Sequence, residues 1–449
     1  MWACVECGHI EHKWVGSCPT CGAWNTFSEE IAIDPKEEAR FGIPKVTARP
    51  RRVTEIEEKE AERMSTNYAE LDALLGKGLV KGSLTLVGGE PGIGKSTLML
   101  QLAHRFAEQG LVVLYICGEE SAEQTTMRAR RLNALNPNIY LLSETVFANI
   151  KREIDGINPD VLILDSVQIV YKAEIPSAPG SVTQVREVAM EAMQIAKGKG
   201  ITTFLIGHVT KSGELAGPRV LEHIVDTVLE FEGDRSHGYR MVRSQKNRFG
   251  PTDEVALFEM KETGLKEVVN PSEVFLQERM RGVSGSCVIP TVEGTRSMLV
   301  ELQALVARST YATAARRTTG VDAKRLTLLL AVLEKRMGYQ LQTYDVFVSI
   351  AGGLKIYEPA VDLAAVIAIT SSFLNKPIPD NVVVMGEVGL NGEVRSIPRA
   401  ETRIKEAINM GFSRCILAKK NLRGIGKEIQ SKITLHGIDR VEEAVELLF

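Results

Sequence analysis

A glycine-rich segment between a strand pattern and a helix pattern places the strongest constraint on the fold. The apolar run Leu84 to Gly88 leads into GEPGIGKST, and the LMLQLAHRFAEQG that follows has helical periodicity. A GxxxxGKS motif in this context binds phosphate, because its glycines let backbone amides approach the phosphate oxygens. We expect Lys95 to reach the β and γ phosphates and the Ser96 hydroxyl to ligate Mg²⁺. The predicted nucleotide-binding residues are Gly89, Glu90, Pro91, Gly92, Ile93, Gly94, Lys95, Ser96 and Thr97.

Acidic residues at the ends of two other strand patterns are candidate catalytic groups. The buried pattern Val161 to Leu164 ends in Asp165, the expected second magnesium contact. The next residue is Ser166, so a class that keeps its water-activating glutamate beside that aspartate fits poorly. Glu119 and Glu120 follow the preceding strand pattern, and we favour Glu119 as the general base. Glu120 stays an alternative base, and a further alternative is that this GEE segment merely caps the next helix.

A third strand pattern, Ile201 to Gly207, ends at His208. At the sheet edge that carries the phosphate loop, His208 is a candidate sensor of the γ-phosphate, although a single histidine is usually structural. Segments 172–181 and 211–219 carry glycine, proline and alanine and are predicted to be mobile loops.

The stretch QKNRFGP at Gln245 to Pro251 places two cations at the end of a strand pattern. Tyr239 to Arg243 alternates polar and apolar residues, as a half-buried strand does. Lys246 and Arg248 are two residues apart, so both should face one side. Such a pair suits an anionic target, and the alternative is an ordinary solvated turn.

Four of the seven cysteines form two CxxC pairs within the first 21 residues. Four thiolates at this spacing suit a tetrahedral, structural Zn²⁺, and a redox-active CxxC is the alternative. Trp2, Trp14 and Trp24 all fall within the first 24 residues and are expected to cover the metal. The predicted zinc ligands are Cys4, Cys7, Cys18 and Cys21.

Length and charge narrow the remaining possibilities. A chain of 449 residues exceeds a single core, so several domains are expected. Residues 29–64 are highly charged, contain three prolines and lack apolar periodicity, which is typical of a linker. A net charge of −3 confines any nucleic-acid site to a local patch or a lined channel. The absence of a long apolar run and of a signal-like N-terminus favours a cytoplasmic protein.

Beyond about residue 274 the pattern indicates a separate α+β domain. Strands are predicted at 284–290, 297–303 and 345–350, and helices at 326–337 and 360–373. Asn391-Gly392 is a hairpin signal, predicted to join strands at 382–385 and 393–397.

Four features in chain order resemble the bacterial RadA (Sms) family of recombination proteins. They are the paired CxxC segment, GGEPGIGKST, GHVTKSGELAGPRVLEH and KNRFG, and the resemblance covers the whole chain. It implies a zinc ribbon at 1–28, a RecA-like ATPase domain at 65–273 and a Lon-protease-like domain at 274–449. It also implies a homo-hexameric ring, ATP hydrolysis stimulated by single-stranded DNA, branch migration of branched DNA, and a RecA-type recombinase as partner. Segments 172–181 and 211–219 would then line the DNA channel.

The resemblance also assigns roles to single residues. It implies that Lys246 and Arg248 reach the γ-phosphate bound by the neighbouring subunit, and contact with DNA phosphates is the alternative. The Lon-type nucleophile position holds Ala360 and the matching lysine position holds Glu401, so the domain should lack peptidase activity.

The leading hypothesis is therefore a DNA-repair motor that uses ATP, Mg²⁺ and Zn²⁺. One rival is a nucleotide-switched ring that binds protein partners without translocating. A second rival, an ATP-dependent protease, is disfavoured by Ala360, Glu401 and the Asp165-Ser166 pair.

Overall fold

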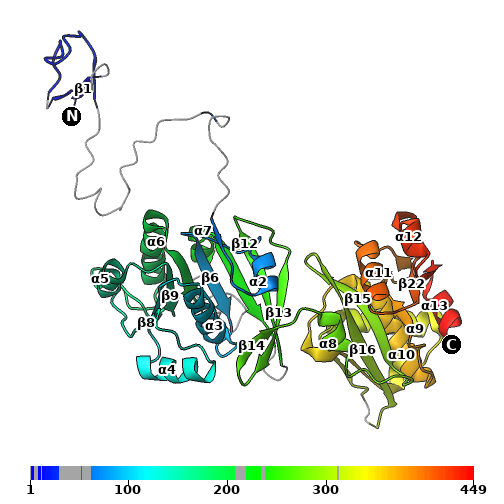
Figure 1. Cartoon of the computed structure of the whole chain (residues 1–449). Coiled ribbons are helices and arrows are strands. Elements are labelled where there is room, and N and C mark those ends of the chain that lie inside the picture. Colours follow the sequence, from blue (N-terminus) through cyan, green and yellow to red (C-terminus); the bar gives the residue numbers. More distant parts are fainter. Residues whose placement is uncertain are drawn as a thin grey trace. The chain divides into compact units, whose positions relative to one another are not determined.

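The computed structural model describes residues 2–4, 9–11, 13–29, 52, 62–207, 219–233, 238–310 and 313–449. The chain divides into two compact units, Met1–Glu60 and Ala61–Phe449. Figure 1 shows the elements of each unit. Within the described residues, no helix combines the length and the apolar character that crossing a membrane requires.

The N-terminal unit is a small antiparallel sheet with the strand order β2-β1-β3. Its strands are β1 (Trp2–Cys4), β2 (Ile10–Glu11) and β3 (Phe27–Glu29). The core consists of Cys4, Cys18 and Phe27, with Trp2 and Val15 packed against it. So small a core supports the expectation that a bound metal stabilises the fold.

A nine-stranded sheet forms the first part of the larger unit, in the order β14-β13-β12-β11-β6-β10-β9-β7-β8. The six strands from β11 to β8 in that order are parallel, and β12, β13 and β14 add an antiparallel extension. The parallel strands are β6 (Leu84–Gly89), β7 (Val113–Cys117), β8 (Ile139–Leu142), β9 (Val161–Asp165), β10 (Thr202–Ile206) and β11 (Thr227–Glu232). The others are β12 (Tyr239–Asn247), β13 (Val255–Lys261) and β14 (Gly264–Glu267), and a separate small sheet pairs β4 (Arg63–Met64) with β5 (Leu79–Val80).

Helices pack on both faces of this sheet (Figure 1). One apolar core joins the sheet to α2 (Ala69–Leu74), α3 (Lys95–Glu108) and α4 (Ala122–Arg131), and the other joins it to α5 (Phe147–Ile157), α6 (Val182–Lys199) and α7 (Arg219–Ile224). Strand side chains alternate between the two cores: Tyr115 on β7 faces the first, and Ile116 faces the second. This α/β arrangement follows from strands that are apolar on both sides.

Strand β12 differs from the prediction made for Tyr239 to Arg243. A half-buried, alternating strand was expected, but Arg240, Met241 and Val242 are all buried. The expectation was wrong because β12 lies inside the sheet between β11 and β13. The Arg240 Nε donates to the Ile93 carbonyl at 3.0 Å, which lets a cation occupy a buried position.

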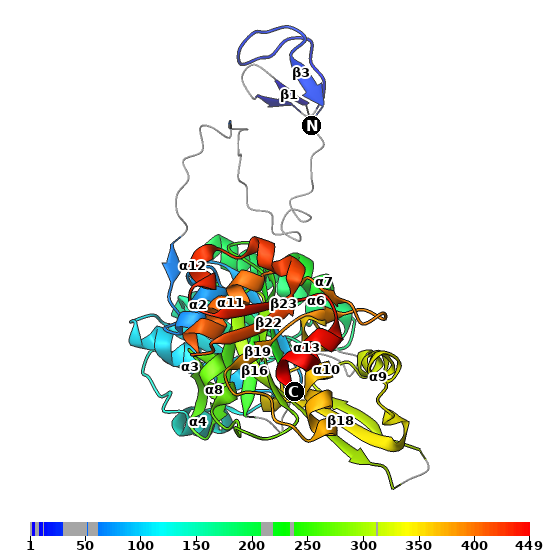
Figure 2. The same cartoon turned by 90° about the vertical axis from the view of Figure 1, so that its right-hand side faces the viewer.

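The second part of the larger unit is a seven-stranded mixed sheet in the order β17-β18-β16-β15-β19-β22-β23 (Figure 2). Its strands are β15 (Ser286–Glu293), β16 (Arg296–Arg308), β17 (Arg316–Thr319), β18 (Tyr344–Ile350), β19 (Val382–Val384), β22 (Arg414–Ala418) and β23 (Thr434–Ile438). The α-helices of this part are α8 (Pro271–Leu276), α9 (Ala323–Met337), α10 (Asp362–Leu374), α11 (Ala400–Asn409), α12 (Lys427–Gln430) and α13 (Val441–Leu448). Helix α10 is buried along most of its length, including Ile367 and Ile369 at 0% exposure.

The predicted hairpin at Asn391-Gly392 forms, but with different strands. Strand β20 (Glu387–Val388) pairs antiparallel with β21 (Val394–Arg395). The expected partner at 382–385 instead becomes β19, which pairs in parallel with β15 and β22. The expectation was wrong because this short apolar run is buried within the large sheet, where it gains two neighbours.

Candidate nucleotide-binding site

The phosphate loop follows β6 and opens α3, as the sequence predicts. Gly89 and Gly94 have φ values of 149° and 122°, a region that favours glycine. A Cβ at Gly89 would lie 2.8 Å from the Cβ of Phe231, so this position also needs a small residue. Ser96 and Thr97 lie in the first turn of α3, where backbone amides point out of the helix end.

Lys95 is only 4% exposed and bends back over the loop. Its Nζ donates to the carbonyl oxygens of Gly89 at 2.8 Å and Glu90 at 3.0 Å. Burial lowers the pKa of Lys95 to about 8, and the negative charges of Asp165 and Glu119 oppose this shift. Both predicted catalytic carboxylates therefore lie close enough to act on the predicted phosphate-binding cation.

The two carboxylates come from neighbouring strands. β7 and β9 are parallel, with Cys117 opposite Asp165, so Glu119 and Asp165 emerge at the same edge. The Tyr115 hydroxyl donates to Asp165 Oδ2 at 2.6 Å, and the Ser166 hydroxyl donates to Glu119 Oε1 at 2.6 Å. Neither hydroxyl was predicted from sequence patterns as a partner of these carboxylates.

Glu120 is occupied differently from Glu119. Its carboxylate accepts a hydrogen bond from Arg128 on α4. The N-cap of α4 is Ser121, whose hydroxyl accepts from the Gln124 amide, so the capping alternative for the glutamates is not what this helix uses. The arrangement favours Glu119 over Glu120 as the group that faces the nucleotide.

His208 and segment 211–218 lie outside the described residues. The loop at 172–181 lies within the described residues, and a side chain of α6 contacts it. The Gln184 side-chain amide donates to the carbonyl oxygens of Lys172, Ile175 and Ser177, at 2.9 to 3.1 Å. A buried amide with three carbonyl acceptors holds the loop in one conformation.

Lys246 and Arg248 lie in the same region, near the buried carboxylate of Asp226. The Lys246 Nζ donates to the carbonyls of Glu222 and Val225 at the end of α7. Arg248 is 55% exposed, and its guanidinium lies 3.6 Å from Asp226 Oδ1. Burial, and then the charge of Arg248, lower the pKa of Lys246. The two cations thus share a neighbourhood, as their spacing predicts.

The strand register places this pair away from its own phosphate loop. The Arg248 amide donates to the Asp226 carbonyl, and the Asp226 amide donates to the carbonyl of Leu84, where β6 begins. Gly89 ends the same strand five residues later, which is roughly 17 Å at 3.3 Å per residue. Within one chain, Arg248 therefore lies near the start of strand β6, whereas the phosphate loop follows the end of that strand.

The other residues of the KNRFG stretch shape a turn. Asn247 Oδ1 accepts the Phe249 amide at 3.0 Å. A Cβ on Gly250 would lie 2.8 Å from the Cα of Gly76, so only glycine allows the two segments to approach this closely. These residues hold the backbone from which Arg248 projects.

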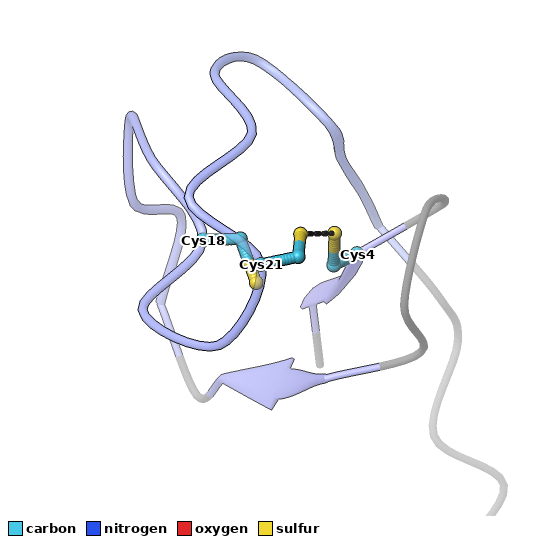
Figure 3. Close-up of side chains that lie close together, drawn as sticks. All are labelled: Cys4, Cys18 and Cys21. Atoms are coloured by element: carbon cyan, nitrogen blue, oxygen red, sulfur yellow. Dashed lines mark hydrogen bonds between the residues drawn. The ribbon is translucent and has the colours of Figure 1, made fainter.

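Three predicted zinc ligands converge in the N-terminal unit (Figure 3). The Sγ atoms of Cys4, Cys18 and Cys21 all lie within 4.8 Å of one another. Cys7 lies outside the described residues. Three clustered thiols on two knuckles fit a tetrahedral thiolate site, and these residues would hold the metal. Among the tryptophans, Trp2 packs on this core, but Trp14 and Trp24 are 51% and 75% exposed, so the expectation that all three cover the metal was wrong.

The positions that match a Lon-type dyad hold an alanine and a glutamate. Ala360 is buried, and Glu401 is exposed and forms an ion pair with Lys405 at 2.8 Å. Nearby in sequence, Glu358 accepts two hydrogen bonds from the buried Arg403, at 2.5 and 2.8 Å. An ion pair thus stands next to the position where a nucleophile would be needed.

Family models match three segments of the chain. They describe an AAA domain at residues 49–214, a rubredoxin metal binding domain at 2–29 and subunit ChlI of Mg-chelatase at 318–421. The phosphate loop and paired carboxylates on a parallel sheet, together with the zinc ribbon, define a RecA-like P-loop ATPase, which confirms the predicted fold class. The AAA match supports ATP as the nucleotide, and the cysteine cluster supports zinc as the metal.

Relatives of known name match along the whole chain. DNA repair protein RadA of Chlamydia pneumoniae is 52% identical over 449 residues, which covers 100% of this chain and 98% of the relative. The same-named proteins of Chlamydia muridarum and Bacillus subtilis are 51% and 49% identical, and cover 98% and 97% of those relatives and 100% and 98% of this chain. A solved structure of a KaiC-like protein from Pyrococcus horikoshii is 21% identical, covers 46% of this chain and 100% of that one, and has a TM-score of 0.40. The chain belongs to the family of the DNA repair protein RadA.

The lowered pKa of Lys95 predicts proton uptake on nucleotide binding. With a pKa of about 8, Lys95 is mostly charged at pH 7 and mostly neutral at pH 8.5. Bound phosphates favour the charged form, so binding of Mg·ADP should take up a larger fraction of a proton per site at pH 8.5 than at pH 7. Calorimetry in buffers of different ionisation enthalpy measures this uptake. Lys95→Arg stays charged at both pH values and is the control, so equal uptake in that variant would contradict the assignment to Lys95.

The thiol cluster predicts that zinc loss unfolds only the N-terminal unit. Replacing Cys18 and Cys21 by Ser should lower bound zinc from about one ion per chain to none, because two thiolates are removed. The thermal transition of the larger unit should remain, since the two units are separate. Metal analysis and calorimetry measure both effects, and Cys287→Ala is the control outside the cluster. Full zinc content in the double variant would refute the ligand assignment.

Proposed function

We propose that this protein is a DNA-dependent ATPase motor that processes recombination intermediates during DNA repair. The observation that carries the proposal is the convergence of Lys95, Glu119 and Asp165 at one edge of the sheet. The names of the relatives supply the DNA-repair context. Branch migration in the cytoplasm, with a RecA-type recombinase as partner, is the finer form of the proposal.

In this proposal one chain supplies the residues that bind the nucleotide and its Mg²⁺ ion. Mg²⁺, when bound, neutralises charge on the β and γ phosphates, and Ser96 and Asp165 would hold it. Lys95 contacts the same phosphates, and Glu119 accepts the proton of the attacking water. His208 is the proposed γ-phosphate sensor. The buried Lys95 favours charged phosphate, because an ammonium removed from water gains more from an anion than an exposed one does.

We further propose that the active unit is a homo-hexameric ring. Arg248 is exposed and lies at the sheet edge opposite its own phosphate loop, which supports action on the nucleotide of a neighbouring subunit. Lys246, held by the end of α7, adds positive charge beside it. Such a cation stabilises the charge that develops on the transferred phosphoryl group, so hydrolysis depends on assembly.

The domain division that we propose follows the two large sheets. The charged linker at 29–64 leads into the ATPase domain at 65–273, and the inactive Lon-protease-like domain occupies 274–449. Helix α8 forms the junction, because its Ser272 hydroxyl accepts the Leu299 amide of β16 at 3.0 Å.

A DNA-driven motor predicts stimulated ATP turnover. Single-stranded DNA should raise the turnover number of the wild-type protein several-fold, because strand binding in the ring organises adjacent sites. Phosphate release with and without DNA measures this effect, and Lys95→Ala is the inactive control. An ATP turnover number that is unchanged by DNA but is changed by a protein partner would favour the rival nucleotide-switched ring.

A cation that acts between subunits predicts rescue in mixed rings. Arg248→Ala should bind ATP normally and hydrolyse it roughly 10³-fold more slowly, because its own phosphate loop is intact. Mixed with Lys95→Ala, it should regain partial activity, since some interfaces then hold one sound loop and one sound cation. ATP turnover of the mixture measures the rescue.

Lys261→Ala, which removes an exposed cation from β13, is the matched control and should keep full activity. An Arg248→Ala protein with normal basal turnover, and loss only of DNA stimulation, would favour the DNA-phosphate alternative. If rings shown to contain both variants regain no ATP turnover, the result would contradict the action of Arg248 on a neighbouring subunit.

A further inference from the structure

Two buried hydroxyl groups each donate to one of the two catalytic-site carboxylates. Tyr115 is 1% exposed and its hydroxyl lies 2.6 Å from Asp165 Oδ2. Ser166 is fully buried, and its hydroxyl lies 2.6 Å from Glu119 Oε1. Each hydrogen bond joins the two neighbouring strands β7 and β9. Tyr115 on β7 donates to Asp165 at the end of β9, and Ser166, directly after β9, donates to Glu119, which follows β7.

We propose that Tyr115 and Ser166 are positioning residues of the nucleotide site. Tyr115 fixes Asp165 so that its other oxygen faces the magnesium position, and Ser166 fixes the Glu119 carboxylate toward the attacking water. Neither residue touches the nucleotide. The inference rests on the proposed ATPase function, because it assigns Asp165 and Glu119 the roles stated there.

Tyr115 is suited to act as a permanent donor. An ordinary phenol, with a pKa of about 10, is protonated at physiological pH, so the Tyr115 hydroxyl acts as a donor to Asp165. A neutral phenol donates to one carboxylate oxygen and leaves the second oxygen free. Since a carboxylate rotates about its last bond, fixing one oxygen fixes the direction of the other.

Ser166 can hold Glu119 because the backbone between them is tightly packed. The Gly118 amide donates to the Asp165 carbonyl at 2.7 Å. A Cβ on Gly118 would lie 2.3 Å from Ile169 Cδ1, so the glycine brings the segment before Glu119 against the loop after β9. The residue after Asp165 is a serine and not a glutamate. Because the two segments are in contact, the hydroxyl of this serine can orient Glu119, which follows the neighbouring strand.

The first test separates metal positioning from general stability. Tyr115→Phe keeps the ring and removes the donor. The Mg²⁺ concentration at half-maximal binding of a fluorescent, non-hydrolysable ATP analogue should rise roughly tenfold, as expected for one hydrogen bond to a charged group. Turnover at saturating Mg²⁺ should stay within about threefold of wild type.

Tyr68→Phe is the matched control, since Tyr68 is also buried but its hydroxyl donates to the Leu265 carbonyl, at 3.4 Å, and to neither catalytic-site carboxylate. A Tyr115→Phe protein with a lower melting temperature and an unchanged Mg²⁺ midpoint would overturn the role of Tyr115. This binding titration needs no hydrolysis, so it can fail while the ATPase proposal stands. A wild-type protein that binds nucleotide without hydrolysing it would instead refute the proposed function.

The second test examines Ser166. Ser166→Ala should lower kcat roughly 10-fold to 100-fold, with the ATP KM and the Mg²⁺ midpoint little changed, because the base is misaligned while the phosphate contacts remain. Ser166→Cys keeps a weak donor of similar size and should give an intermediate kcat.

Ser83→Ala is the matched control, because the buried Ser83 hydroxyl has no hydrogen-bond partner among the described residues. Its turnover should equal that of the wild type. Equal kcat values for Ser166→Ala and wild type would overturn the role of Ser166. So would equal losses in the Ala and Cys variants, because a purely steric defect does not depend on a donor.

Discussion

The burial of one ammonium group organises the nucleotide site. Lys95 lies at the end of an apolar strand with 4% of its surface exposed, which is tolerable only if anions and carbonyl oxygens surround it. Gly89 and Glu90 supply the carbonyls, and the carboxylates of Asp165 and Glu119 supply the charge. The neighbouring order of β7 and β9 brings both acids to that edge. The buried Lys95 ammonium is stabilised by nearby negative charge, so it also favours the binding of the negatively charged phosphates of a nucleotide.

The opposite edge of the sheet carries a second buried charge. Asp226 is 3% exposed, and its carboxylate accepts the Leu84 amide at 3.0 Å and the Lys197 ammonium at 2.6 Å. Arg248 approaches the other oxygen of this carboxylate at a longer distance and is largely exposed. Because the Arg248 side chain is 55% exposed and lies 3.6 Å from Asp226 Oδ1, this ion pair is weak and leaves the guanidinium available to another anion. Strand β6 therefore has a charged centre at each end.

Sequence patterns predicted the parts of this site that are continuous in the chain. The phosphate loop and the strand ending in Asp165 each depend on fewer than a dozen neighbouring residues, so local periodicity was sufficient. The hydroxyl donors could not be found in this way, because Tyr115 and Asp165 are 50 residues apart and meet only through strand order. The burial of Arg240 was missed for a related reason: alternation cannot tell an interior strand from an edge strand.

In the C-terminal sheet, an ion pair stands close to the position that a peptidase would use for its nucleophile. Arg403 is 1% exposed and donates to Glu358 and to the Pro290 carbonyl, while Thr291 donates to the same glutamate at 2.6 Å. Removing one partner of such a pair leaves an uncompensated buried charge, at a cost of roughly 3–5 kcal/mol. Arg403 lies on α11, and Pro290 and Thr291 lie on β15, so the ion pair with Glu358 joins this helix to the second sheet.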